Sequence, residues 1–96
     1  MKPVRVTRRA IADTLEAWIY IAERNPRAAD AWEEALTRQY DLLALFPESG
    51  SLDPAAGPNV RSVVFGDYRV FYRVMDTEVV IARILHGARD IEKEFR

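Results

Sequence analysis

The sequence is short of two residue types on which many functional sites depend. It has no cysteine and only one histidine, His86. A chain without cysteine forms neither disulfides nor thiolate metal sites, and one imidazole does not supply the set of histidines that zinc sites use. We therefore expect no metal and no other cofactor.

Long apolar runs are also missing. The basic start, "MKPVRVTRR", is not followed by the apolar stretch of a signal peptide, and no run approaches the roughly 20 residues of a membrane-spanning helix. We expect no contact with a membrane and a cytoplasmic location.

Neither sign of charge dominates the sequence. The chain carries 14 basic and 15 acidic side chains, for a net charge of −1, whereas strong non-specific binding to phosphates needs many cations. All the basic side chains except Lys2 and Lys93 are arginine. Arginine favours planar, bidentate pairing and is enriched at protein interfaces, so this choice indicates protein partners.

What the chain does contain is enough for one folded domain. Its 96 residues are 49% hydrophobic and 30% charged, which is ordinary for a soluble globular protein. A chain of this length builds a single core, so we expect one domain over residues 1–96.

The first half of the chain has helical periodicity. "KPVRV" predicts a short strand over residues 2–6, and Thr7 is placed to cap the helix that follows. Spacings of three and four make that helix amphipathic, with an apolar stripe of Ile11, Leu15, Trp18, Ile19 and Ala22. In "RNPRAAD", Asn25 suits a left-handed helix C-terminus and Pro26 suits the first turn of a new helix. Two helices should meet there in a tight hairpin.

The second helix should end at "PESG", where Pro47 and Gly50 break its pattern. Its predicted inner side consists of Ala29, Trp32, Ala35, Leu36, Leu42, Leu43 and Phe46. A solvated face should carry the acids Asp30, Glu33, Glu34 and Asp41. The helical spacing of Trp18 and Trp32 favours a place in the core for both.

After a turn-rich loop, "SLDPAAGPN", the apolar period changes from about 3.6 to about 2. "VRSVVF", "YRVFYRVM" and "EVVIARIL" are β-branched and aromatic runs separated by "GD" and "DT", which is typical of three antiparallel strands. A two-residue turn at 76–77 predicts the pairs Tyr72–Ile81, Val70–Arg83, Phe71–Ala82 and Arg69–Ile84. We expect the helical hairpin on one face of this sheet and a mixed arginine and apolar surface, open to a partner, on the other.

The predicted order is therefore β-α-α-β-β-β. This is an α+β fold, in which an N-terminal helical hairpin packs on a mostly antiparallel sheet. A short C-terminal helical tail should follow Gly87, with Asp90 as its cap.

Four stretches together resemble a known family. "NPRAADAW", "LALFPESGSL", "VRSVVFGDYRVFYRV" and "RILHGARD" look like the ParE/RelE superfamily of bacterial toxins from type II toxin–antitoxin operons, over nearly the whole chain. The resemblance implies a bacterial toxin in a hetero-oligomer with a cognate, ParD-like antitoxin, and contact with operator DNA only through that antitoxin. RelE-like members cut messenger RNA on the ribosome, whereas ParE-like members typically poison DNA gyrase.

The residues favour the ParE-like branch. For RelE-like enzymes, the resemblance implies two lysines, two arginines and a C-terminal tyrosine as the catalytic set. The arginines match Arg69 and Arg89, but the lysine positions fall on Val60 and Ser62 and the tyrosine position on Phe95. Phenylalanine has no proton to transfer, so that part of the chemistry is missing. We expect an inhibitor that acts by binding gyrase and is not itself an enzyme.

Two alternatives stay open. The first is a ribonuclease with a rearranged site built from Arg69, His86 and Arg89; a second arrangement in the superfamily uses a C-terminal histidine with an upstream glutamate, here Glu48. The other is a non-toxic member that only binds antitoxin or regulates transcription.

Several residues are candidates for contact with the target or the antitoxin: Arg61, Arg69, Arg73, Arg83, His86, Arg89 and Phe95. We expect Arg69 and Arg73 on one face of their strand, where Asp67, Asp76 or an antitoxin carboxylate could pair with them. Arg61, Arg83 and Arg89 could join them in one patch.

His86 and Gly87 have a structural as well as a functional interpretation. We favour the structural one, in which the imidazole bonds locally at a strand end and glycine permits an otherwise strained turn.

Overall fold

The computed structural model describes residues 1–96 and has a two-sided architecture around one sheet. The elements in order are β1 Val4–Val6, α1 Arg8–Ala22, α2 Pro26–Leu45, β2 Ser51–Leu52, the 3-10 helix η1 Pro54–Ala56, β3 Arg61–Phe65, β4 Tyr68–Val74, β5 Val79–His86 and α3 Ile91–Glu94. The strand order is β1-β5-β4-β3-β2, and only the β1–β5 pair is parallel. The predicted α+β class and hairpin are confirmed.

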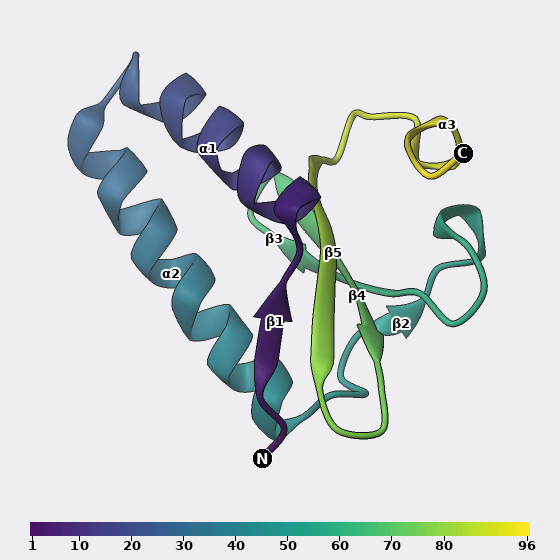
Figure 1. Ribbon diagram of the computed structural model, residues 1–96. Helices are drawn as coiled ribbons and strands as arrows, with labels where there is room; N and C mark the ends of the chain where they lie inside the picture. The colour runs from purple at the N-terminus through teal and green to yellow at the C-terminus, as the bar shows by residue number, and fades with distance from the viewer.

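Figure 1 shows the helical hairpin on one side of the sheet and η1 with α3 on the other. We call the side under α1 and α2 the helix face, and the side under η1 and α3 the far face. The core of the helix face contains Ala10, Leu36, Leu43, Val70, Tyr72, Val79, Ile81 and Ile84. A smaller core on the far face contains Ala56, Val60, Phe71 and Leu85, with Ile91 and Phe95 packed against it. The far face is therefore less open than the sequence predicted.

The helix caps follow local side-chain chemistry. The Thr7 Oγ1 accepts a hydrogen bond from the Ala10 N–H at 3.2 Å, as predicted. The left-handed position predicted for Asn25 is wrong: its φ is −156°, and it caps the N-terminus of α2 by accepting from the Ala28 N–H. The end of α1 needs no left-handed residue because the N–H groups of Glu23 and Asn25 donate back to carbonyls of the last turn. Pro26 begins α2, as predicted.

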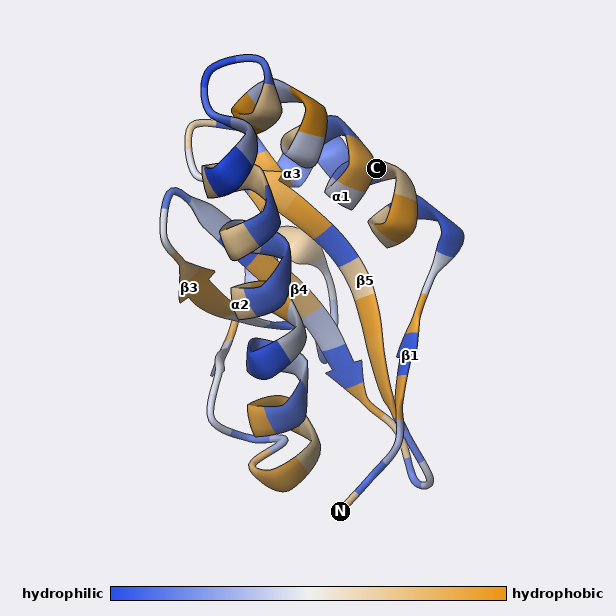
Figure 2. Cartoon of the chain, turned by 90° about the vertical axis from the view of Figure 1, so that its left-hand side faces the viewer, coloured by the Kyte–Doolittle hydropathy of each residue, from blue (hydrophilic) through white to orange (hydrophobic).

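Helix α1 turns a different side to the sheet than its large residues suggest. Ala10 and Ala17 are buried, at 0% and 4% exposure, and bring the helix backbone close to β5. Ile11, Leu15 and Ile19 remain 57%, 58% and 45% exposed. The predicted apolar stripe therefore exists but points away from the sheet, and Figure 2 shows it as apolar bands on the outside of α1.

Helix α2 buries only part of its predicted inner side. Leu36 and Leu43 are buried as expected, but Leu42 is 50% exposed and Phe46 is 62% exposed. Phe46 follows the last helical residue, so its side chain no longer follows the helical repeat. The acids Asp30, Glu33, Glu34 and Asp41 are exposed, as predicted.

The predicted core position of the tryptophans holds only in part. Trp32 is half-buried beside the helix-face core, and its ring centroid lies 5.9 Å from that of Phe65 and 5.4 Å from that of Tyr68. Trp18 is also half-buried, but it lies on the side of α1 that faces α2 and packs against neither core. Core placement is therefore wrong for Trp18.

A β-bulge changes the predicted register between β4 and β5. Tyr72 lies opposite Ile81 as predicted, but Phe71 lies opposite Arg83 instead of Ala82. The same shift changes the other two pairs, which become Val70–Ile84 and Arg69–Leu85. The bulge lies where β1 ends: the β1–β5 pairing stops at Val6 and Ile81, and the Thr7 hydroxyl donates to the Ala82 carbonyl at this edge.

The loop before β3 is more ordered than predicted, since β2 and η1 form within it. Its anchor is Gly50, whose N–H donates to the buried Tyr72 hydroxyl at 2.9 Å and whose carbonyl accepts from Arg61 at 2.8 Å. A Cβ at position 50 would lie 2.7 Å from the Ser62 carbonyl oxygen, so only glycine fits this contact.

Candidate functional site

The predicted site residues divide between the two faces of the sheet. Tyr68 pairs with His86, and the next pair along the strands is Arg69 with Leu85. Successive side chains in a strand point to opposite faces. Tyr68 packs beside the helix-face core and Leu85 belongs to the far-face core, so His86 and Arg69 lie on opposite faces.

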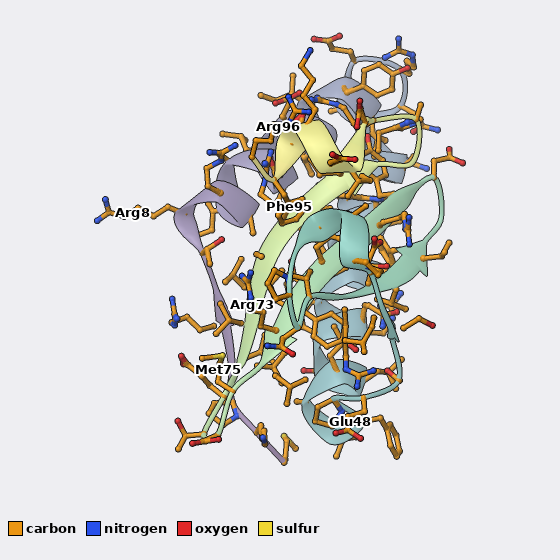
Figure 3. The ribbon with its side chains drawn as sticks, turned by 90° about the vertical axis from the view of Figure 1, so that its right-hand side faces the viewer. Arg8, Glu48, Arg73, Met75, Phe95 and Arg96 are labelled. Atoms are coloured by element: carbon orange, nitrogen blue, oxygen red, sulfur yellow. The ribbon has the colours of Figure 1, made fainter.

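The far face gathers most of the positions that match the RelE catalytic set. Val60 is fully buried there, and the Phe95 ring packs edge-on against Phe71 with centroids 5.2 Å apart. Figure 3 shows Phe95, which directly follows α3, beside the strands that it covers. Ser62 is 6% exposed and donates to the Asp53 carboxylate at 3.1 Å. These positions form packing contacts instead of an open polar cleft.

Arg69 is held by neighbours on the same face. One of its Nη atoms lies 3.0 Å from Asp53 Oδ2 and donates to the Ser62 hydroxyl at 2.7 Å. The guanidinium carbon is 5.5 Å from the centre of the Phe71 ring. The predicted pairing with Asp67 or Asp76 is wrong, because Asp53 comes from the loop that folds onto this face. Arg69 is therefore already neutralised by a carboxylate of the chain itself.

Arg73 and Arg61 have separate roles on neighbouring strands. Arg73 lies four residues from Arg69 on β4 (Figure 3). It is half-buried and makes no side-chain hydrogen bond. Arg61 pairs with the Gly50 carbonyl and so anchors the loop. The predicted single patch does not form; its members would have been Arg61, Arg69, Arg73, Arg83 and Arg89.

Arg83 is the most buried arginine, with 8% exposure. Its Nε and one Nη donate to the two carboxylate oxygens of Asp13, at 2.7 and 3.1 Å, and the other Nη donates to the Glu94 carbonyl at 3.2 Å. The hydrogen bonds to Asp13 raise the pKa of Arg83 above its usual value. Asp13 also accepts from the Ile84 N–H, so it joins α1 to β5 and through Arg83 to α3. Arg83 thus holds the fold together and is not free for a partner.

A cleft of about 320 Å³ opens on the helix face where β5 ends. We call it the tail cleft; its polar and aromatic lining includes Glu16, Tyr20, Tyr68, His86 and Arg89. Arg89 donates to Glu16 at 3.1 Å and to Glu94 at 2.8 Å, and its side chain is still 46% exposed. Burial, followed by the nearby hydroxyl of Tyr20 and the carboxylates of Asp67 and Glu16, raises the pKa of Tyr68.

His86 has the local bond expected of it. Its Nδ1 accepts from the Ala88 N–H at 3.1 Å, which assigns the imidazole proton to Nε2, and its ring lies edge-on to Tyr68 at 5.3 Å. The strained turn predicted for Gly87 is wrong, since positive φ angles among glycines occur at Gly57 and Gly66 only. Gly87 instead donates its N–H to the Asp67 carbonyl at 2.8 Å.

A second hollow, of about 720 Å³, lies between the two helices. We call it the hairpin groove; its lining includes Leu15, Trp18, Leu36, Tyr40, Asp30 and Glu33. The Tyr40 hydroxyl is buried there without a hydrogen-bond partner. Burial raises the pKa of Tyr40 to about 12, and the nearby Thr14 hydroxyl partly offsets this rise. Sequence reasoning missed this groove, although an excess of large apolar residues on both helices was a signal for it.

Other classes of site are not prominent. No three His, Asp or Glu side chains gather as a metal site would require. None of the helices combines the length and the apolar character of a membrane span.

The sequence model described as the ParE toxin of the type II toxin–antitoxin system parDE matches residues 4–91. The chain belongs to the ParE toxin family. Among the relatives of this ParE-family toxin, Toxin ParE1 of Caulobacter vibrioides is 38% identical over 88 residues, which are 90% of each chain. Toxin RelE2 of the same organism is 38% identical over 89 residues, which are 93% of this chain and 99% of the relative.

Solved structures agree with this assignment. The chromosomal ParDE system of P. aeruginosa matches with a TM-score of 0.77 at 24% identity, over 90% of this chain and 96% of the other. The toxin–antitoxin complex RelBE2 of Mycobacterium tuberculosis matches with a TM-score of 0.60 at 28% identity, over 88% and 96%. The ParE-family fold is therefore established over nearly the whole chain.

Proposed function

We propose that this ParE-family toxin acts by binding DNA gyrase and does not cut RNA. The observation that carries this proposal is the closed far face. Four of the five positions that match the RelE catalytic set lie there: Val60, Ser62, Arg69 and Phe95. They serve a hydrophobic cluster and an ion pair, so none of these four positions offers a free cation or a free proton donor for RNA cleavage.

The separation of the remaining candidates supports the same conclusion. Cleavage by a ribose 2′-hydroxyl needs a base, an acid and a cation around one phosphate. His86 and Arg89 meet at the tail cleft, while Arg69 is bound to Asp53 on the opposite face. No single phosphate can lie against all three groups without a rearrangement of the sheet.

The tail cleft is our candidate for target contact. It brings together an exposed arginine, two tyrosines and an imidazole, and arginine and tyrosine are enriched where proteins bind each other. His86 and Arg89 would make direct contacts there, and Arg73 on the far face remains a further candidate. Arg61, Arg83 and Phe95 would then act through the fold alone.

A ParD-like antitoxin would cover the hairpin groove. Two matched structures come from a ParDE system and a RelBE2 complex, which supports a toxin–antitoxin hetero-oligomer for this chain as well. The groove has an apolar floor with Asp30 and Glu33 on one wall, so it fits an amphipathic helix with basic flanking residues. Operator DNA would be bound by the antitoxin, and the toxin alone should be poorly soluble.

An alternative is a ribosome-dependent endonuclease, because relatives at 38% and 34% identity carry the name Toxin RelE. Substitution of single arginines separates the two functions. A ribonuclease should lose activity in both Arg69→Ala and Arg89→Ala, by orders of magnitude each. A gyrase inhibitor that uses the tail cleft should lose growth inhibition in Arg89→Ala and keep it in Arg69→Ala.

The difference between the two variants is measured in cells as the amount of inducer that is needed to arrest growth. Wild-type protein that causes no arrest would identify the non-toxic, regulatory member instead. Protein levels must be matched by immunoblot, since Arg69→Ala also removes the ion pair with Asp53.

A further inference from the structure

Helix α1 carries an apolar row that the fold itself does not use. Ile11, Leu15 and Ile19 follow one another at intervals of four residues and are 57%, 58% and 45% exposed. We call this row the α1 ridge. The opposite side of α1 is fixed on the sheet by Ala10, Ala17 and the carboxylate of Asp13, so the ridge has no part in holding the helix in place.

The ridge forms one edge of the hairpin groove, since Ile11 and Leu15 belong to both and Ile19 extends the ridge beyond it. Rows of residues four apart form ridges on a helix, and such ridges pack into grooves of a neighbouring helix. One molecule thus offers an apolar ridge and a groove of about 720 Å³ on the same surface. A surface that carries both features can be complementary to itself.

The arrangement of the ridge suits a two-fold axis at Leu15. Ile11 and Ile19 are equally distant from Leu15 along the helix, so a crossing of two antiparallel copies places Ile11 of one near Ile19 of the other. Antiparallel packing buries the whole ridge of both copies and leaves Leu15 near Leu15 at the centre.

Charges beyond the ridge select this orientation over the parallel one. Arg8 begins α1 and Glu23 follows its last residue; both are exposed, and neither forms an ion pair within the chain. Figure 3 shows Arg8 extending away from the body of the molecule. An antiparallel crossing brings Arg8 of each copy toward Glu23 of the other, while a parallel crossing brings like charges together.

We propose that a second copy of this chain covers the α1 ridge, with the two α1 helices crossing antiparallel at Leu15. The 15-residue helix is about 22 Å long, so the contact is at the small end of specific interfaces. The dimer should therefore have a dissociation constant of roughly micromolar size. The proposal does not depend on the cellular target. It predicts that free toxin pairs with itself through a surface that shares Ile11 and Leu15 with the one proposed for the antitoxin.

The first test is the molar mass of the purified, refolded chain by light scattering over a range of concentrations. Wild-type protein should shift from monomer to dimer, and Leu15→Arg should remain a monomer because two like charges would meet on the axis. Val64→Arg is the matched control, since Val64 is 70% exposed on β3 and lies away from α1. It should dimerise like wild type. Circular dichroism checks that each variant is folded.

Disulfide trapping tests the orientation, because the chain has no cysteine of its own. Leu15→Cys should form a linked dimer on mild oxidation. Ile11→Cys alone should not, but a mixture of Ile11→Cys and Ile19→Cys should give linked heterodimers. A disulfide forms only where the two Cα atoms lie within about 7 Å of each other. The linked pairs therefore report the orientation of the helices and not only that two copies associate.

Three results would overturn the proposal. Wild-type chain that stays monomeric at hundreds of micromolar would show that a different partner uses the ridge. Equal dimerisation of Leu15→Arg and wild type would place the contact elsewhere. Efficient self-linking of Ile11→Cys would show a parallel or non-specific association.

Discussion

The two faces of the sheet differ in how completely the chain covers them itself. The far face is closed by its own loop and tail: Phe95 packs on Phe71, and Asp53 neutralises Arg69. The helix face has the larger core but leaves the hairpin groove, the α1 ridge and the tail cleft open.

This difference separates structural residues from residues available to partners. Large exposed apolar surfaces and buried polar groups without partners mark places where other molecules bind. The α1 ridge and the unpartnered Tyr40 hydroxyl lie on or beside the helix face, whereas the far face carries the exposed Val64 and the unpartnered Nε of Arg69. Four of the five positions that match the RelE catalytic set are on the closed face. The comparison therefore favours a toxin that acts through the contacts of its helix face.

The largest expected effect concerns the ion pair that fixes α1 on the helix face. Asp13→Ala removes the bidentate partner of the buried Arg83 guanidinium and leaves it only the longer contacts with Glu94, and it also removes the acceptor of the Ile84 N–H. We expect the free energy of unfolding in urea to fall by about 3–5 kcal/mol. Glu16→Ala is the control: Glu16 is 72% exposed and pairs with Arg89, so its loss should cost at most about 1 kcal/mol. Equal losses in the two variants would contradict a structural role for the Asp13–Arg83 pair.

The next effect concerns the cover of the far face. Phe95→Ala removes the ring that packs on Phe71 and should lower the free energy of unfolding by about 2 kcal/mol, less than for a fully buried ring. Phe95→Leu keeps an apolar side chain and should cost about half as much. Both variants should still arrest growth where they remain folded. Loss of toxicity in a folded Phe95→Leu protein would show that the far face contacts the target.

A smaller effect is expected from the far-face ion pair. Asp53→Asn keeps the shape of the side chain but removes the charge beside Arg69, whose side chain is 37% exposed. Thermal unfolding should show a loss of about 1 kcal/mol. Asp67→Asn removes an exposed acid without an arginine partner and should change almost nothing. A gain of RNA cleavage in Asp53→Asn, where Arg69 is released, would reopen the ribonuclease interpretation.

The smallest effect at neutral pH belongs to Tyr40 in the hairpin groove. Because its pKa is raised from 10.0 to about 12, the folded state resists ionisation of this phenol. The resulting stability is complete below about pH 10 and is lost as the pH rises toward 12. Tyr40→Phe should unfold in urea like wild type at neutral pH and should lose less stability than wild type above pH 10. Parallel loss in both proteins would assign the alkaline transition to another group.

Much of the fold could be predicted because local patterns determine it. The Thr7 and Asp90 caps, the break at Pro26 and the three β-branched runs of the meander are all set by neighbouring residues, and the structure confirms them. Positions set by distant contacts could not be predicted. The bulge beside Ala82 depends on Thr7 and on where β1 ends, and it moved Arg83 by one register position to face Phe71.

The candidate site was harder to predict because apolar periodicity identifies a stripe but not its partner. On α1 the stripe of large residues predicts the main apolar face, whereas the smaller Ala10 and Ala17 lie against the sheet. The pairing of Arg69 with Asp53 likewise depends on how β2 and η1 fold, which no short pattern encodes. The tail cleft combines α1, β4, β5 and the tail, so it exists only in the folded chain.

The most direct test of the central claim is to expose gyrase and translating ribosomes to the same purified toxin. Supercoiling by gyrase and the integrity of messenger RNA on ribosomes are measured in parallel over one range of toxin concentrations. We predict that supercoiling is lost while the messenger RNA remains intact, and that Arg89→Ala weakens this inhibition. Codon-specific cuts in the messenger RNA, with gyrase still active, would contradict the account.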